Sequence, residues 1–179
     1  WTIDLSRQMG REVLITKDDI HGIMGLSMDE VARRLVPVED PEERERLAKS
    51  AEEFENEYLS TRGGDLFPGV RETLEELLAA GKKMAIVSNC QEGYIPCFMK
   101  SMDMEKYFCD YEEWGRTRTS KGANIRLVME RNGFDRSIYI GDIQKDKDAC
   151  DEAGVPCIYA AFGFGEIENP AATIEKFSD

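Results

Sequence analysis

Short apolar runs alternate with segments of helical period from Asp65 onward, and this alternation restricts the fold more than any other feature of the sequence. Apolar runs without polar alternation are typical of strands buried on both faces, and strands separated by helices form parallel sheets. The sequence therefore predicts an α/β core in which helices flank a parallel sheet. The expected strands are Met84–Val87, Phe108–Tyr111, Ser137–Ile140 and Cys157–Ala160, and the expected helices are Val70–Ala80, Tyr94–Met102 and Ala123–Arg131.

The first third of the chain carries helical signals only. Ser27 with Glu30 has the spacing of a helix N-cap and an acid at the third helical position. Gly63-Gly64 then interrupts the helical pattern. We expect a small all-helical domain at residues 1–64 and the α/β domain at residues 65–179. On one helix of the first third, the side chains expected to face inward are Leu47, Ala51, Phe54 and Tyr58. On Val70–Ala80 they are Leu74, Leu77 and Leu78, and on Ala123–Arg131 they are Ile125, Leu127 and Val128.

The charge of the chain restricts its partners. Asp and Glu number 36 against 23 Lys and Arg among 179 residues, which gives a formal net charge of −13. Such a surface repels phosphate backbones and anionic lipids, so we expect no binding to nucleic acid or to a membrane. An anionic substrate needs local cations or a metal ion. The five cysteines form no Cys-x-x-Cys pair, which indicates a reducing, cytoplasmic compartment, and the choice between a monomer and a homodimer stays open.

Polar side chains follow the predicted strands. Ser88 and Asn89 come directly after the first strand, Lys121 precedes a helix, and Asp142 and Asp146 follow a later strand. In open α/β sheets, ligands collect at the carboxyl ends of the strands. A hydroxyl group and backbone N–H groups can donate to phosphate oxygens, a lysine can neutralise charge, and two acids can hold Mg²⁺ directly or through water. The set therefore suits phosphoryl transfer.

Each of these residues also has a simpler interpretation. Asp142 suits a turn, Asp146 suits a helix N-cap, and Ser88-Asn89 suits the end of a strand. Lys121 alone suits a solvent-facing position before a helix, because lysine is almost never buried without a partner. The combination of all of them in one chain favours the functional interpretation.

The order Ser88-Asn89, Lys121 and Gly141-Asp142 with Asp146 resembles motifs two, three and four of the haloacid dehalogenase (HAD) superfamily, in the branch of phosphoglycolate phosphatase and β-phosphoglucomutase. The resemblance covers about residues 65–165 and implies a Rossmann-like core with a helical cap domain. It implies that Ser88 and Asn89 contact phosphate and that Lys121 pairs with phosphate and with the nucleophile. It also implies that Asp142 ligates Mg²⁺ and that Asp146 supports the metal shell.

The activity that this resemblance implies is a Mg²⁺-dependent phosphatase for a small phosphorylated metabolite, working through an aspartyl-phosphate. Two alternatives stay open, a sugar phosphomutase and a catalytically inactive HAD-like protein that binds or regulates. A dehalogenase is disfavoured, because it does not need the metal-binding acid at Asp142. The cap loop Gly25-Leu26-Ser27 is expected to contact the leaving group and to set specificity.

The first motif of the family, Asp-x-Asp-Gly-Thr, has no match in the chain. Asp4 lies at roughly the expected place, but no apolar run precedes it and no Gly-Thr follows it. In this fold the strand that carries the motif lies at the centre of the sheet, and its loss leaves buried, unpaired backbone groups at about 1–3 kcal/mol each. We therefore expect the natural protein to carry a segment with the nucleophilic Asp before Trp1, and the 179-residue chain alone to be inactive.

Overall fold

The computed structural model describes residue 10, residues 15–36 and residues 38–179. Asp4, the acid nearest to the expected place of the first motif, lies outside the described residues. The elements are α2 (Lys17–His21), α3 (Met28–Leu35), α4 (Pro41–Arg62), α5 (Val70–Ala79), β1 (Met84–Ser88), α6 (Tyr94–Ser101), β2 (Phe108–Glu113), α7 (Trp114–Thr117), α8 (Lys121–Asn132), β3 (Tyr139–Gly141), α9 (Gln144–Ala153), β4 (Cys157–Ala160) and β5 (Ala172–Ile174). Among the described residues, no helix combines the length and the apolar character needed to cross a bilayer.

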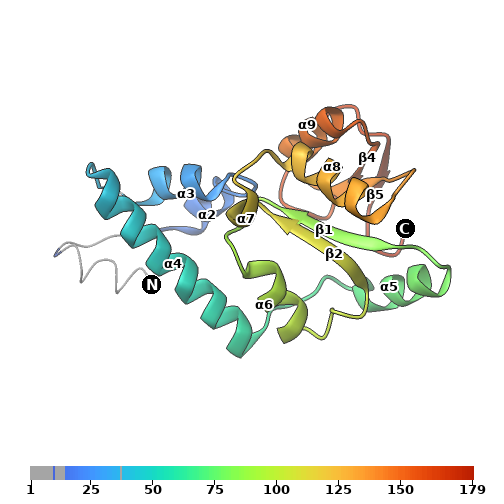
Figure 1. Cartoon of the computed structure of the whole chain (residues 1–179), viewed down its shortest axis with the longest axis horizontal. Helices are drawn as coiled ribbons and strands as arrows, with labels where there is room; N and C mark the ends of the chain where they lie inside the picture. The colour runs from blue at the N-terminus through green and yellow to red at the C-terminus, as the bar shows by residue number, and fades with distance from the viewer. Residues whose placement is uncertain (1–9, 11–14, 37) are drawn as a thin grey trace.

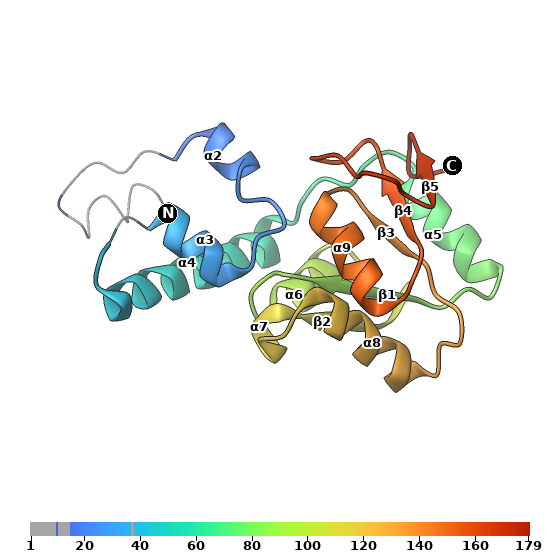
Figure 2. The same ribbon diagram turned by 90° about the horizontal axis from the view of Figure 1, so that it is seen from above.

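The segment α2–α4 consists of three helices joined by short loops, with no strand among its described residues. The Ser27 hydroxyl accepts a hydrogen bond from the Glu30 amide, and the Glu30 carboxylate accepts one from the Ser27 amide, so α3 begins where the sequence predicts. Helix α4 runs for 22 residues to Arg62, and its C-cap is Gly63, which adopts a positive φ of 67°. Figures 1 and 2 show this segment at one end of the molecule, where α4 packs alongside α6. Its assignment as a separate domain that ends at residue 64 stays a prediction.

The predicted α/β architecture is confirmed by parallel strands with helices on both faces. Strand β1 pairs with β2, and β3, β4 and β5 form a second parallel sheet in that order. Successive residues of β1 face opposite helices, since Val87 packs with side chains of α8 and α9 and Ile86 with side chains of α5 and α6. Contact with helices on both faces explains why this strand is continuously apolar.

Strands β1 and β3 belong to different sheets. A side-chain hydrogen bond joins them, because the Tyr139 hydroxyl donates to the Val87 carbonyl at 2.8 Å. Ile138 and Ile140, beside and within β3, are exposed. This separation agrees with the family resemblance, which implies a further strand at the centre of the sheet. The presence of that strand in the natural protein stays a prediction.

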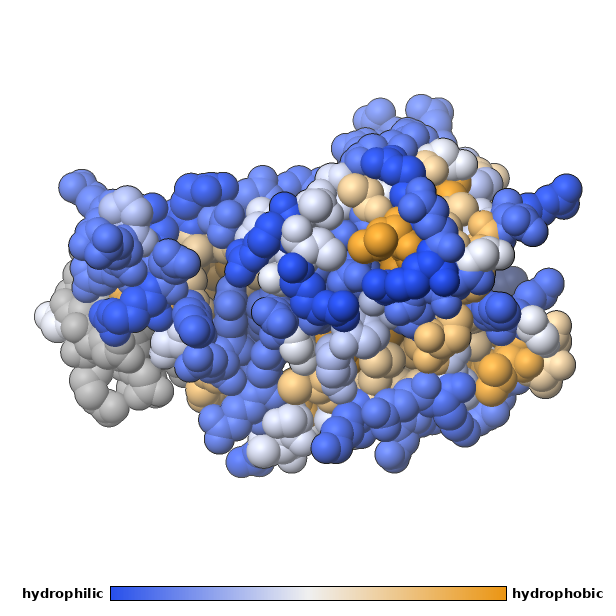
Figure 3. Space-filling model, in the orientation of Figure 1, coloured by the Kyte–Doolittle hydropathy of each residue, from blue (hydrophilic) through white to orange (hydrophobic). Residues whose placement is uncertain are grey.

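Several side chains that we expected to face inward are exposed. They are Phe54 and Tyr58 of α4, Leu78 of α5 and Leu127 of α8. Leu127 lies about 200° around the helix from Ile125, so the two cannot share one face. In α4 the buried side chains are Leu47 and Leu59, and Phe54 stacks on Tyr58 with 6.3 Å between ring centroids. Figure 3 shows a largely hydrophilic surface over α2–α4, with apolar side chains gathered over the half that holds the sheets.

Candidate functional site

Lys121 begins α8, directly after Ser120, whose hydroxyl accepts a hydrogen bond from the Ala123 amide at 3.1 Å. The Lys121 ammonium donates to Oδ1 of Asp146 at 2.6 Å. Only 10% of the Lys121 side chain and 5% of the Asp146 side chain are exposed. The simpler interpretation of Lys121 as solvent-facing is therefore wrong. Because a single buried charge is costly, each of these two groups depends on the other.

Asp146 connects this lysine to Asp142. It stands at the third position of α9, which begins at Gln144, so the interpretation of Asp146 as an N-cap is wrong. Its Oδ2 accepts a hydrogen bond from the Asp142 amide at 3.1 Å. The Asp142 carboxylate accepts one from the Phe164 amide at 2.7 Å. Lys121, Asp146 and Asp142 thus form one connected group beyond the end of β3, here called the Lys–Asp cluster.

Two glycines allow the acids to approach the backbone so closely. A Cβ at Gly141 would lie 2.5 Å from Cβ of Asp146, and one at Gly163 would lie 2.3 Å from Cβ of Asp142. Both distances are shorter than carbon atoms tolerate, so any larger residue would displace an acid. Gly141 belongs to the predicted Gly-Asp pattern. The role of Gly163 depends on a contact across 21 residues of chain and carries no local signal.

Ser88 and Asn89 lie at the end of β1, as predicted. Ser88 is the last residue of the strand and pairs with Glu113 of β2. Burial raises the pKa of the nearby Cys90 thiol to about 12. The Asn89 side-chain amide donates to the Gly25 carbonyl at 3.1 Å, which ties the end of β1 to the helical segment. The phosphate contacts expected of Ser88 and Asn89 stay predictions.

Tyr139 brings the end of β1 next to the Lys–Asp cluster, and the sequence analysis missed it. Its hydroxyl bonds the Val87 carbonyl, and the Lys121 ammonium lies 5.9 Å from the centre of its ring. Burial raises the pKa of Tyr139 well above its ordinary value, and the nearby charge of Asp146 adds to the effect. A tyrosine within an apolar strand is so common that the sequence carries no signal for this role.

A pocket of about 370 Å³ opens beside the cluster. Its lining residues are Ser27, Asn89, Trp114, Arg118, Thr119, Ser120, Lys121, Lys145, Asp148, Ala149 and Glu152. Asn89 and Lys121 therefore open onto the same space, and Ser27 brings the helical segment into its wall. The expected specificity loop at residues 25–27 thus reaches this pocket. Arg118 and Lys145 were not predicted, and with Lys121 they place three cations in the lining, beside the acids Asp148 and Glu152.

The two carboxylates of the cluster can provide one or two ligands of a magnesium ion, but they cannot provide its complete coordination shell. Within the described part of the chain, no group of three or more His, Cys, Asp and Glu side chains is arranged to hold a metal. Both oxygens of Asp146 already accept hydrogen bonds, from Lys121 and from the Asp142 amide. Magnesium is usually held by one or two carboxylates, with water and phosphate oxygens as its other ligands. Asp142 is therefore the better direct ligand, and Asp146 is placed to orient it.

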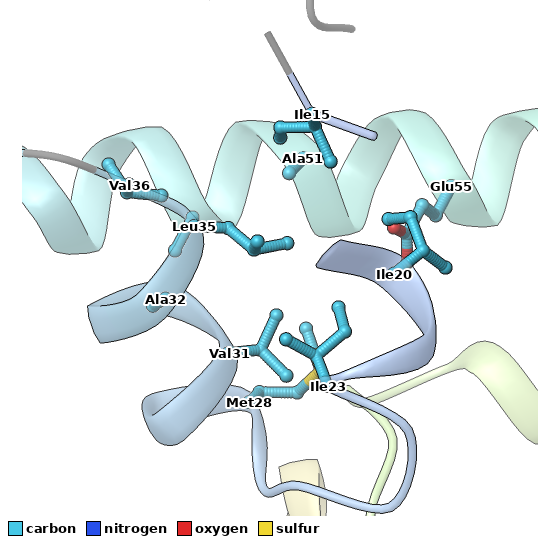
Figure 4. Close-up of a pocket in the computed structure, with 11 residues that line it drawn as sticks. Ile15, Ile20, Ile23, Met28, Val31, Ala32, Leu35, Val36, Ala51 and Glu55 are labelled. Atoms are coloured by element: carbon cyan, nitrogen blue, oxygen red, sulfur yellow. The ribbon is translucent and has the colours of Figure 1, made fainter. Parts of the chain in front are cut away.

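A second cavity, of about 270 Å³, lies inside the helical segment and shares no lining residue with the first. Figure 4 shows the apolar side chains of α2 and α3 pointing toward α4, which presents Ala51 and Glu55 on the facing side. The Gln91 side-chain amide donates to the Glu55 carboxylate at 3.1 Å, and burial raises the pKa of Glu55. This contact joins α4 to the loop after β1.

Parallel strands between helices, with a lysine and two aspartates gathered beyond β3, are the arrangement of the HAD-like class. The sequence model of the haloacid dehalogenase-like hydrolases matches residues 4–160. The match covers most of the chain, and the chain belongs to this family. The resemblance drawn from the motifs is confirmed.

Curated relatives carry the name phosphoglycolate phosphatase. The protein from Pseudomonas syringae pv. tomato is 30% identical over 147 residues, which cover 67% of this chain and 53% of the relative. The protein from Photorhabdus laumondii is 31% identical over 132 residues, which cover 69% of this chain and 56% of the relative. The chain thus spans about half the length of these relatives.

Solved structures share the fold. A predicted phosphoglycolate phosphatase from Haemophilus somnus superposes with a TM-score of 0.83 at 19% identity, covering 98% of this chain and 85% of that chain. CbbY from Rhodobacter sphaeroides, in complex with phosphate, superposes with a TM-score of 0.78 at 17% identity, again covering 98% and 85%. At these identities the likeness shows the HAD-like fold alone.

Proposed function

We propose that the protein containing this chain is a phosphatase that hydrolyses the phosphoric monoester of a small metabolite. The observation that carries this proposal is the buried Lys121–Asp146 ion pair with its hydrogen-bonded link to Asp142. The order of these residues in the sequence, which resembles the third and fourth motifs of the family, supports the proposal. The phosphatase names of the relatives support the same reaction class.

Each residue has a distinct part in this proposal. The Lys121 ammonium neutralises charge on the transferring phosphoryl group, which lowers the barrier when water is excluded. Asp142 holds Mg²⁺ directly, and Asp146 orients both Asp142 and Lys121. The ion, when bound, supplies further charge neutralisation at the phosphate oxygens. Ser88 and Asn89 donate hydrogen bonds to those oxygens from the end of β1.

The nucleophile in this proposal is the first aspartate of the Asp-x-Asp-Gly-Thr motif, which has no match in the chain. Its carboxylate attacks phosphorus and forms an aspartyl-phosphate, while the second aspartate protonates the leaving group and then activates the water that hydrolyses the intermediate. A strand carrying both acids would run between β1 and β3, which the described residues leave in separate sheets.

The helical segment is the proposed cap of this site. The Asn89–Gly25 hydrogen bond and the place of Ser27 in the pocket wall support that role. A small phosphorylated metabolite is the proposed substrate class, and the phosphoglycolate named by the relatives is one member of it. A cytoplasmic location and a monomeric or homodimeric state stay predictions.

Phosphate release from p-nitrophenyl phosphate by the full-length protein tests the proposal. We expect turnover with Mg²⁺ and none with a chelator. Lys121→Met and Asp142→Asn should each lower kcat/KM by about 100-fold or more. Lys147→Met is the matched control, because Lys147 pairs at 2.6 Å with Asp151, within α9, and makes no ion pair with Lys121, Asp142 or Asp146. Turnover that persists in both site variants, with circular dichroism unchanged, would rule the assignment out.

A further inference from the structure

We propose that Lys145 and Arg118 are positioning residues that hold the helical segment closed over the pocket through two ion pairs, Lys145–Glu30 and Arg118–Asp29. These are named below the closing ion pairs. The inference deepens the proposed function and rests on it only for the effect on turnover. The closure itself is measured without any substrate.

The closing ion pairs connect elements far apart in sequence. The Lys145 ammonium lies 3.3 Å from Oε1 and 3.2 Å from Oε2 of Glu30, so it contacts both carboxylate oxygens. An Arg118 guanidinium nitrogen lies 3.8 Å from Oδ1 of Asp29. Both acids occupy the first turn of α3, while both cations lie in the α/β part. Opposite charges therefore face each other across the boundary between the two parts.

One group of each pair, Glu30 or Arg118, is held in place by a further neighbour. Glu30 also accepts a hydrogen bond from the Ser27 amide at 2.8 Å, and this bond, followed by that of Lys145, lowers the pKa of Glu30. The Arg118 guanidinium lies 4.2 Å from the centre of the Trp114 ring, a cation–π contact that fixes its direction. Lys145 directly precedes Asp146 in α9. The Lys145–Glu30 pair thus connects the helical segment to the start of α9, where Asp146 lies.

Uncharged contacts at the same boundary indicate that the closed arrangement is specific. Asn89 donates to the Gly25 carbonyl, as described above. A Cβ at Gly25 would lie 1.8 Å from Cδ1 of Ile143, so the loop rests directly on the residue that follows Asp142. Gly25 also has a φ of +72°, which disfavours any other residue. The loop therefore packs against the cluster itself.

The closing ion pairs control access to the pocket because their cations, Lys145 and Arg118, line it together with Ser27 and Lys121. Their side chains are 45% and 58% exposed, and those of Glu30 and Asp29 are 43% and 61% exposed. Ion pairs this exposed are individually weak and sensitive to salt. Weak pairs suit a contact that must open to admit a substrate and close again before chemistry.

Hydrogen exchange measured by mass spectrometry on residues 22–27 tests the closure. We expect the double variant Arg118→Gln/Lys145→Gln to exchange about 3- to 10-fold faster there than the wild type at low salt. The conservative variant Arg118→Lys/Lys145→Arg should restore the wild-type rate. Lys147→Gln, which removes an ion pair within α9 and does not reach the helical segment, is the matched control and should leave the rate unchanged. In the wild type, 0.5 M salt should raise the exchange rate of residues 22–27 by nearly as much as the double substitution does.

Unchanged exchange in the double variant, or equal acceleration by Lys147→Gln, would overturn the proposal. In the full-length protein the double variant should also raise KM about 3- to 10-fold, because closure completes the pocket. If the wild type releases no phosphate, the proposed function fails. The exchange rates still test whether the closing ion pairs hold the helical segment over the pocket. A rise in KM without any change in exchange would mean that the two cations contact the substrate directly, which refutes the closing role.

Discussion

The ion pair between Lys121 and Asp146 explains why both of these charged side chains are buried. Removing one partner of a buried ion pair costs about 3–5 kcal/mol, whereas an exposed pair such as Lys106–Glu75 is worth about 0–1 kcal/mol. The lysine is therefore buried because the acid is there, and the acid is fixed because the lysine is there. A site that depends on such a pair is rigid before any ligand binds, which favours electrostatic catalysis.

The buried thiol of Cys150 makes stability depend on alkaline pH. Burial raises its pKa from an ordinary value of 9.0 to about 12, and the nearby Cys157 adds to the shift. Between these two values the unfolded chain loses a proton that the folded chain keeps. The stability present below pH 9 is therefore lost as the pH rises toward 12.

We expect the free energy of unfolding of the wild type to fall by about 1 kcal/mol more than that of Cys150→Ala when the pH rises from about 8 to about 10. Urea unfolding at the two pH values measures this difference. Cys109→Ala removes an exposed thiol and should keep the wild-type pH dependence. The same pH dependence in the wild type and in Cys150→Ala would show that the thiol does not contribute.

Helix α6 depends on a side chain from another element. Its N-cap is Gly93, with a φ of 86° and no side-chain hydrogen bond of its own. The buried Glu113 of β2 accepts hydrogen bonds from the Gly93 amide at 2.6 Å and from the Ile95 amide at 3.3 Å. A carboxylate in this place satisfies N–H groups that the helix leaves unpaired and complements its dipole. Strand β2 therefore fixes where α6 begins.

Glu113→Leu should lower the free energy of unfolding by about 2–3 kcal/mol, because it leaves the amides at the start of α6 buried and unpaired. Urea denaturation followed by circular dichroism measures the loss. The matched control is Glu105→Leu, which replaces an exposed glutamate between α6 and β2 and should stay within about 0.5 kcal/mol of the wild type. Similar losses in the two variants would argue against the capping role.

The elements that the sequence predicted well are those with local signals. Helix α3 begins where the sequence predicts because Ser27 and Glu30 form a reciprocal cap, and β4 has the predicted bounds because its apolar run is short and isolated. Helix α7 and strand β5 were missed because four and three residues are too few to show a period. The residue types of the site were predicted, but the Lys121–Asp146 pair and the contact of Gly163 with Asp142 join distant segments and have no local pattern.

The whole molecule carries a strong negative charge and still gathers cations at one place. Against a net charge of −13, the pocket brings Arg118, Lys121 and Lys145 together. These cations lie beside the pocket acids Asp148 and Glu152, so their attraction for an anionic substrate acts locally, whereas the net charge of the chain repels polyanions. Strands β1 and β3, each at the edge of one of the two parallel sheets, are joined by the hydrogen bond from the Tyr139 hydroxyl to the Val87 carbonyl.

This arrangement leads to a prediction about the chain as a whole. The 179-residue chain by itself should release no phosphate from p-nitrophenyl phosphate with Mg²⁺, because the nucleophilic motif of the family has no match in it. A longer protein that carries Asp-x-Asp-Gly-Thr ahead of Trp1 should be active. The same longer protein with both motif aspartates replaced by asparagine keeps the strand and loses the nucleophile, so it should be as inactive as the short chain. Mg²⁺-dependent turnover by the short chain would place the nucleophile among its own residues and would remove the need for a strand between β1 and β3.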